Sequence, residues 1–132
     1  MIKEVGHIGI AVQDIESTLD AFCGALGLTK PVIRDFPDRK MRMALISLGR
    51  ISLELLEDNS QDGMLARLVR ERGSHIHHFC LTTDDLETDI SELKKKGVKM
   101  ANGSPSIGLR GKRVLFAIAG ILDNIPIELS EL

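Results

Sequence analysis

The sequence predicts an α+β fold made of two tandem βαβββ modules. Strand-like and helix-like hydrophobic periods alternate along the 132 residues, and part of this pattern occurs twice. The segment HIGIAVQDIE at residues 7–16 aligns without a gap on HFCLTTDDLE at residues 78–87. Each copy reads as a strand followed by a helix that begins at an aspartate, a preferred N-cap residue.

The first module covers about residues 1–56. Period-two alternation predicts its first strand over residues 4–12, and the spacing of apolar residues predicts a helix that begins after Asp14 and ends at Gly27. A tight turn at Gly49-Arg50 joins the last two of the strands that follow. These three strands are expected at about residues 31–36, 41–48 and 51–56. A connector at about residues 57–74 contains a short helix that ends at Gly73.

The second module covers about residues 75–132 and completes a single domain of residues 1–132. Its helix is expected to begin at the Asp85 cap and to end at Gly97. A turn at Asp123-Asn124 joins the last two strands, and the segment ILDNIPIELS resembles GRISLELL of the first module. Strands are expected at about residues 98–101, 112–119 and 125–130.

Composition argues against nucleic acid and membrane as partners. The chain has a net charge of −2, a pI near 6.1 and neither Trp nor Tyr, so it offers no basic surface and no aromatic stacking platform. No apolar run reaches the roughly 18 residues that span a bilayer, and MIKEVGHIGI lacks the apolar region of a signal peptide. We therefore expect a cytoplasmic protein with both cysteines reduced.

Four ionisable residues are expected on one face of the strands. Side chains alternate along a strand, so His7, Glu54, His78 and Glu128 each point away from the apolar, helix-packed face. Two imidazoles and two carboxylates suit a divalent first-row metal, with positions left open for substrate. The alternative is four isolated polar groups on a solvated face. The repeat argues against it, because it pairs His7 with His78 and Glu54 with Glu128.

The motifs HIGIAV, LELL, IHH and IEL resemble the vicinal oxygen chelate (glyoxalase/bleomycin resistance/dioxygenase) superfamily over nearly the whole chain. RGSHIHH and IGLRGKRVLF further resemble the methylmalonyl-CoA epimerases within it. The resemblance implies a U-shaped mixed sheet around a central metal site, with the helices on the outer face, in a homodimer. It gives ligand roles to His7, Glu54, His78 and Glu128. The ion would be cobalt, as in the epimerases, or zinc or nickel, as in glyoxalase I, and manganese also stays open.

The implied reaction is epimerisation of 2-methylmalonyl-CoA or a similar acyl-CoA, through a metal-stabilised enolate formed beside the thioester. Glu54 and Glu128 would be the catalytic acid and base. The strand before Glu54 shows only Met43 where some epimerases carry a separate catalytic glutamate. Either a ligand glutamate would serve twice, as in glyoxalase I, or the protein does not epimerise. Arg110 and Lys112 lie in a glycine-containing loop that could bind the phosphates of CoA, or be merely solvated.

Two other functions stay open for the same fold. One is a glyoxalase I-type lactoylglutathione lyase, which shares the metal and the enolate but not the CoA. The other is a non-catalytic small-molecule-binding protein, against which the four ligand-type residues argue. Within RGSHIHHFCLTT only His78 has both the strand parity and the repeat partner of a ligand. His75 and His77 are expected to be structural, and Cys80 shares the face of His78.

Overall fold

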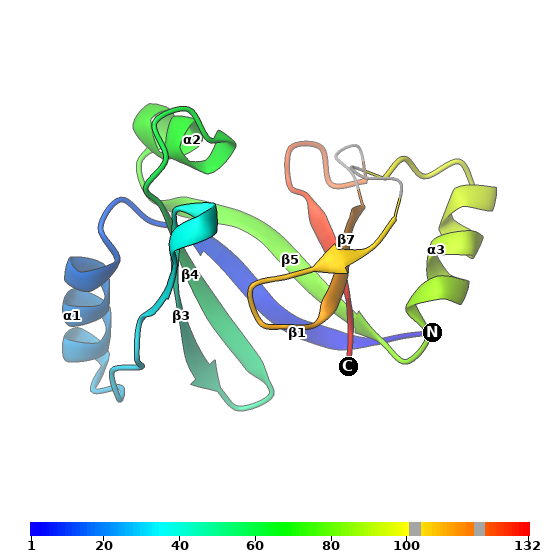
Figure 1. Cartoon of the computed structure of the whole chain (residues 1–132). Helices are drawn as coiled ribbons and strands as arrows, with labels where there is room; N and C mark the ends of the chain where they lie inside the picture. Colours follow the sequence, from blue (N-terminus) through cyan, green and yellow to red (C-terminus); the bar gives the residue numbers. More distant parts are fainter. Residues whose placement is uncertain (101–103, 118–120) are drawn as a thin grey trace. The chain divides into compact units, whose positions relative to one another are not determined.

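The computed structural model describes residues 1–100, 104–117 and 121–132 (Figure 1). Eight strands and three α-helices within these residues confirm the predicted α+β class. In chain order the elements are β1 (Ile2–Ala11), α1 (Ile15–Leu26), β2 (Arg34–Phe36), the 3-10 helix η1 (Pro37–Arg39), β3 (Met41–Leu48), β4 (Ile51–Asp58), α2 (Met64–Arg72), β5 (His75–Thr83), α3 (Leu86–Lys95), β6 (Ser106–Ile107), β7 (Arg113–Ala117) and β8 (Ile127–Glu131).

The chain forms two compact units whose boundaries fall inside strands β1 and β5. The first, here called the N-terminal unit, is Gly9–Ile76. The second, the C-terminal unit, combines Met1–Ile8 with His77–Leu132. The first eight residues of the chain therefore belong with the second repeat, which brings His7 into the same unit as His78 and Glu128. The predicted single domain of two modules stays a prediction.

The N-terminal unit is built on the antiparallel strands β2, β3 and β4, with β4 next to β1. Helix α1 packs on β3 and β4 (Figure 1), and its apolar side joins one hydrophobic cluster with residues of both strands. Leu53 and Leu55 pack in this cluster, as strand parity predicts. Glu54, between them, points to the opposite face by the alternation of β4.

Helix α1 begins and ends where the sequence predicts. The Asp14 carboxylate accepts a hydrogen bond from the Ser17 N–H at 3.0 Å, and Gly27 ends the helix in the left-handed region, with φ of 66°. Glu57 of β4 supplies a second cap. Its Oε2 accepts from the Ile15 N–H at 2.7 Å, which satisfies a donor that the first helical turn leaves unpaired.

In the C-terminal unit the strand order is β1-β5-β8-β7-β6. Strand β5 pairs with β8 in parallel, and β8 with β7 and β7 with β6 are antiparallel. Helix α3 covers one face of these strands, and Leu81, Leu115 and Leu129 pack against it. Leu81 and Leu129 are predicted on this face. The alternation of β5 and β8 then directs His78 and Glu128 to the other face.

The predicted strand at 98–101 is wrong over the residues described. Residues 98 and 99 are not in a strand, residue 100 makes a single bridge, and residue 101 lies outside the described residues. The reason is the end of α3. The Val98 N–H donates to the Leu93 carbonyl at 3.0 Å, and Gly97 has a φ of 79°, so this segment closes the helix instead of pairing with a strand.

Other strand boundaries differ by a few residues. The strand predicted from residue 31 begins at Arg34, and the short strand β6 has no counterpart in the sequence prediction. The predicted strand at 112–119 corresponds to β7, and its last two residues lie outside the described part of the chain. The turn at residues 123–124 is present, with Asp123 at a φ of 51°.

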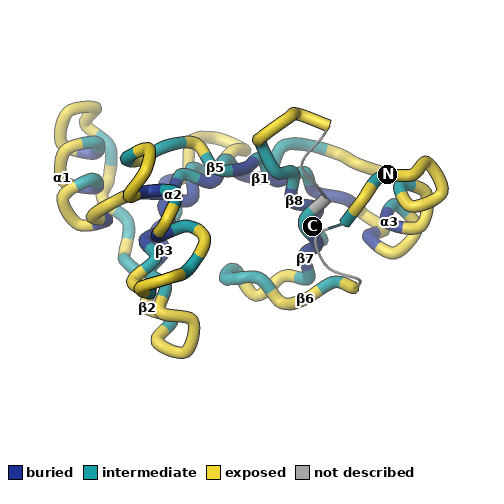
Figure 2. The backbone as a smooth tube through the Cα atoms, turned by 90° about the horizontal axis from the view of Figure 1, so that it is seen from above, coloured by how far each residue is buried: buried dark blue, intermediate teal, exposed yellow. Residues whose placement is uncertain are grey.

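Burial follows the strands and the strand-facing sides of the helices, while turns and outer helical faces are exposed (Figure 2). Several polar residues are buried too, among them His7, Glu54, His78 and Glu128. Burying polar and ionisable groups is costly unless they are paired or bind an ion, so these residues mark the place to look for function. Among the described residues no helix is long and apolar enough to cross a membrane.

The core under α3 gives a stability prediction. Leu129 is 1% exposed, so Leu129→Ala leaves a cavity between β8 and α3 and should lower the free energy of unfolding by about 2–5 kcal/mol in urea denaturation. Leu132→Ala is the matched control, because Leu132 is exposed and its loss should change stability by less than about 0.5 kcal/mol. Similar losses in the two variants would contradict the assigned core.

Candidate metal centre

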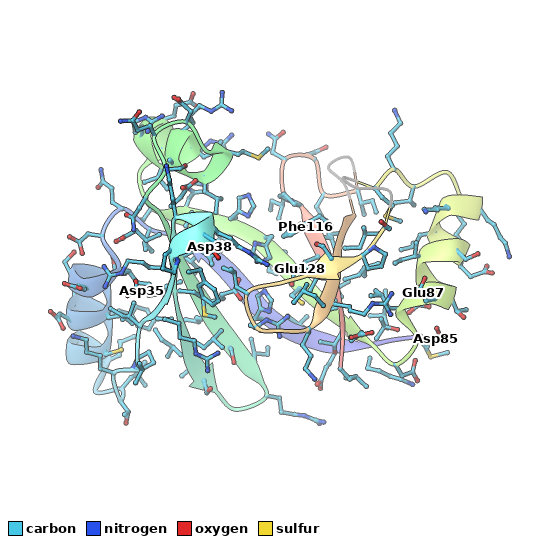
Figure 3. All side chains as sticks on the ribbon, viewed as in Figure 1. Asp35, Asp38, Asp85, Glu87, Phe116 and Glu128 are labelled. Carbon is cyan, nitrogen blue, oxygen red and sulfur yellow. The ribbon has the colours of Figure 1, made fainter. Side chains whose placement is uncertain are left out.

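Strand register sets out the site within the C-terminal unit. Cys80 of β5 lies opposite Glu128 of β8, and Glu128 lies opposite Phe116 of β7. These three residues form a row across the face that points away from α3, and Figure 3 labels two of them, Phe116 and Glu128. His78 is two positions before Cys80 and shares its face.

Both predicted histidine ligands meet on this face. The Nε2 atoms of His7 and His78 are 3.1 Å apart, and their rings pack edge to face with centroids 5.2 Å apart. The carboxylate of Glu128 completes the group. Its Oε1 is 3.5 Å from His7 Nε2, and its Oε2 is 3.9 Å from His78 Nε2. Three of the four predicted ligands are therefore in one buried cluster.

Burial keeps both histidines neutral at ordinary pH. Desolvation, with a smaller contribution from the positive charge of Arg110, lowers the pKa of His7 from 6.5 to about 3. The pKa of His78 falls to about 3 for the same main reason, with His7, His77 and Arg110 adding to the effect. A neutral imidazole has one nitrogen lone pair available for a metal ion. Protons therefore do not compete with a metal at these two residues near neutral pH.

Burial also acts on Glu128, in the opposite sense. Desolvation raises the pKa of this carboxyl group, while its hydrogen bonds to Cys80 and Arg110 and the charge of Arg110 oppose the rise. A buried carboxylate with a raised pKa accepts a proton more readily than an exposed one. Glu128 therefore has the properties of a general base as well as those of a ligand.

His77, which the sequence predicts to be structural, contacts the predicted ligand His78. Its Nδ1 is 2.9 Å from His78 Nδ1, so one of these two nitrogens donates to the other. If His78 donates, its proton is held at Nδ1 and its Nε2 lone pair is directed toward His7 and Glu128. Histidines that bind metals commonly donate their second nitrogen in this way. His75 is a structural residue, as predicted, with Nδ1 2.8 Å from the Gly73 carbonyl oxygen.

The residues present fit a divalent metal ion. Two nitrogens bound to one ion at about 2.1 Å each lie about 3 Å apart when they are adjacent ligands, and the Nε2 atoms here are 3.1 Å apart. Ligand atoms of His7, Cys80 and Glu128 also lie within 4.8 Å of one another. The donors are neutral imidazole, carboxylate and thiol, which suit a borderline first-row ion.

Arg110 points into the same cluster. It lies in the turn before β7, which is closed by a 3.0 Å hydrogen bond from the Gly111 N–H to the Gly108 carbonyl. Its Nη2 is 3.2 Å from Ser130 Oγ, 3.5 Å from Glu128 Oε1 and 3.7 Å from Cys80 Sγ. Lys112 instead donates to the Leu132 carbonyl at the surface. The phosphate contacts predicted for these two cations stay a prediction.

Glu54, the fourth predicted ligand, belongs to β4 of the N-terminal unit. It is buried, and it lies opposite Leu45 in the pairing of β3 with β4. Met43, at the position that the resemblance gives to a separate catalytic glutamate, is fully buried in the same unit. Glu54 therefore has the burial and the strand face expected of a ligand, and its role stays a prediction.

Sequence reasoning missed three neighbours of the cluster. The Phe116 ring packs edge to face on His78, with centroids 5.3 Å apart, and Ser130 contacts Arg110. Strand parity could have found both residues. Ser130 is two positions after Glu128 on β8, and Phe116 is the cross-strand partner of Glu128. The contact between His77 and His78 could not be found this way, because adjacent strand residues nominally face opposite sides.

These features define a class of protein, one with repeated βαβββ modules and buried metal-type ligands on the strand face opposite the helices. The sequence profile of the Glyoxalase/Bleomycin resistance protein/Dioxygenase superfamily matches residues 6–116, and the chain belongs to this superfamily. The predicted resemblance is confirmed at that level.

Relatives that align over nearly the whole of this chain indicate the branch of the superfamily. The chain is 29% identical over 133 residues to an ethylmalonyl-CoA/methylmalonyl-CoA epimerase of Cereibacter sphaeroides, covering 99% of each protein. It is 26% identical to the human mitochondrial methylmalonyl-CoA epimerase, covering 98% of this chain and 74% of that protein.

Solved structures agree with the fold. A hypothetical protein, BH1468 from Bacillus halodurans, superposes with a TM-score of 0.90 at 32% identity, over 98% of this chain and 94% of that one. A variant of Streptomyces coelicolor methylmalonyl-CoA epimerase bound to 2-nitronate-propionyl-CoA has a TM-score of 0.89 at 23% identity. The superposition covers 99% of this chain and 98% of the other, and it shows that the two proteins share a fold.

The neutral histidines predict a pH dependence of stability in the metal-free protein. Each has a folded pKa near 3 and an unfolded value near 6.5, so between these values the unfolded chain binds more protons. The free energy of unfolding should therefore fall as the pH is lowered through this window, by up to about 1.4 kcal/mol per pH unit for each histidine. Urea denaturation at pH 7 and at pH 5 measures it.

His78→Asn should flatten this dependence, because it removes one buried group that titrates in the unfolded chain. A wild-type slope in His78→Asn would contradict the assigned burial of a neutral His78.

Proposed function

We propose that this protein is a metal-dependent epimerase of 2-methylmalonyl-CoA or a similar acyl-CoA. The observation that carries the proposal is the convergence of two buried, neutral histidines on the Glu128 carboxylate. The epimerase relatives, which align over nearly the whole chain, support this substrate class. A homodimer, which the resemblance implies, and a cytoplasmic location, which the sequence predicts, are also part of the proposal.

His7, His78, Glu128 and Glu54 would hold the metal. A divalent ion bound there supplies Lewis-acid stabilisation of the negative charge that develops on the thioester carbonyl oxygen during enolisation. Cobalt, zinc, nickel and manganese are all compatible with two imidazoles and two carboxylates. Burial of two carboxylates supports the proposal, because a dication compensates charges that are costly to desolvate.

The protein's own groups move the proton. One glutamate accepts the proton from C2 of the acyl group as the C–H bond breaks. The electron pair of that bond passes into the enolate. Return of a proton to the opposite face of C2 gives the other epimer, so a second acid is needed across the plane of the enolate. Glu128 has the raised pKa of a proton acceptor, and Glu54, its partner in the repeat, is proposed for the opposite face.

A glyoxalase I-type reaction and simple ligand binding are the competing functions. These two functions and the proposed one use the same fold. The epimerase and the glyoxalase also use the same metal ligands. They differ in what the experiment can detect. Only the epimerase exchanges the C2 proton of methylmalonyl-CoA with solvent, whereas a glyoxalase would form lactoylglutathione and a binding protein would do neither.

Metal content tests the shared premise. Protein purified without chelator should contain about one divalent ion per chain by elemental analysis, and His78→Ala should lose it, because the variant removes one of the converging nitrogens. His77→Ala should retain metal with about 10- to 100-fold weaker affinity, as is usual when the partner of a ligand histidine is removed. His75→Ala is the control and should bind metal like the wild type. Metal-free wild-type protein would contradict the premise.

Proton exchange tests the reaction. In D₂O the wild type should incorporate deuterium at C2 of methylmalonyl-CoA, followed by mass spectrometry. Glu128→Gln should slow this exchange by about 10²- to 10⁴-fold, because the amide cannot accept the proton. Glu131→Gln is the matched control on the same strand, since Glu131 pairs with Arg113 and not with the cluster. Wild-type exchange in Glu128→Gln would refute the role of Glu128, and lactoylglutathione formation would favour the lyase.

A further inference from the structure

We infer that Arg110 recognises the free carboxylate of the acyl group and so selects malonyl-type CoA esters over esters without a second carboxylate. The inference deepens the proposed function and rests on it. It assigns Arg110 to the reacting end of the substrate, in place of the CoA phosphates that the sequence indicated.

The first step is the direction of the side chain. Arg110 leaves the surface turn between β6 and β7 and reaches Ser130 and Glu128 on β8 and Cys80 on β5. Its side chain is 21% exposed, so the guanidinium lies largely inside the fold while keeping access to solvent. The CoA phosphates are large, strongly hydrated groups that are best bound at the surface, whereas a small carboxylate can reach a recessed cation.

The second step is the position of the guanidinium relative to the metal ligands. Nη2 of Arg110 is 3.5 Å from Glu128 Oε1, and the same oxygen is 3.5 Å from His7 Nε2. One carboxylate oxygen thus separates the guanidinium from the converging nitrogens. A substrate whose thioester carbonyl lies at these nitrogens has its C2 substituents a few ångströms away, within reach of Arg110.

The third step is the chemistry of the guanidinium. Arg110 is a cation held within the fold, and its Nη2 is 3.5 Å from Glu128 Oε1 on the face that carries the converging nitrogens. A substrate carboxylate that reaches Nη2 forms a charge-assisted hydrogen bond, which is stronger in a recessed site of low dielectric constant than at the surface.

An uncharged acyl group or a hemithioacetal offers no carboxylate for this hydrogen bond. Guanidinium and carboxylate also match in shape, since the planar guanidinium can donate two parallel hydrogen bonds. Arg110 therefore accounts for discrimination in favour of a dicarboxylic acyl-CoA over glutathione adducts. It is a specificity-determining residue for the proposed reaction.

The affinities of two CoA esters, measured in the wild type and in variants of Arg110, test this assignment. Isothermal titration calorimetry of the metal-loaded protein compares racemic methylmalonyl-CoA with propionyl-CoA, which lacks the carboxylate. The reaction only interconverts epimers, so binding can be measured at equilibrium. The wild type should prefer methylmalonyl-CoA by about 10- to 100-fold, the range of a hydrogen bond between charged groups. Arg110→Gln should reduce this preference to less than about threefold and leave propionyl-CoA binding nearly unchanged.

Two further variants make the result specific. Arg110→Lys should retain part of the preference, because it keeps the charge but not the planar donor pair. Lys112→Gln is the control in the same loop, and it should change the affinity for both esters by one common factor, if at all, since both carry the same CoA phosphates. Elemental analysis should find the wild-type metal content in Arg110→Gln.

The contrary results are equally distinct. Equal weakening of both esters by Arg110→Gln would assign Arg110 to the phosphates, and loss of metal from this variant would assign it to holding Glu128; either overturns the inference. Undiminished preference in Arg110→Gln overturns it as well. Absence of deuterium exchange in the wild type would instead remove the proposed function itself.

Discussion

The parallel pairing of β5 with β8 is the constraint on which the site depends. Both strands place leucines against α3 on one face. Because strand side chains alternate, the residues next to these leucines must point to the opposite face. The register then brings Cys80 opposite Glu128, and His78, two positions before Cys80 on β5, lies on the same face. A shift of one residue in this pairing would move the ligands under the helix and the leucines into the site. The apolar core therefore fixes the geometry of the polar cluster, and stability and function rest on the same contacts.

Much of this arrangement could be predicted, because two periodicities carry it. The bounds of α1 follow from its Asp14 cap and its Gly27 stop, and the packing of Leu53, Leu55, Leu81 and Leu129 follows from alternation. The repeat added what periodicity cannot give, since it linked His7 to His78 and Glu54 to Glu128 across distant parts of the sequence. Three of these four residues form one cluster in the C-terminal unit, which His7 joins through the first strand.

The parts that could not be predicted depend on backbone turns and on long side chains. The segment after α3 has the composition of a strand, but the hydrogen bond from Val98 to Leu93 uses its backbone to close the helix. The contact of Arg110 with Glu128 was not predicted, because a sequence does not show whether a long side chain in a loop turns inward. The contact of His77 with His78 likewise departs from ideal strand alternation. Local pattern gives the face of a residue, whereas the reach of its side chain depends on tertiary structure.

The electrostatics of the cluster reconcile two demands on the same residues. A ligand histidine must lose its proton, and burial together with the nearby Arg110 lowers the pKa of His7 and His78 to about 3. A general base must have enough affinity for a proton to accept it, and burial raises the pKa of Glu128. One low-dielectric environment does both, because it disfavours the charged form of either group. Arg110 opposes the rise in the pKa of Glu128. Under the proposed function, this balance would let one glutamate serve as both ligand and base, with Met43 at the position of a separate acid.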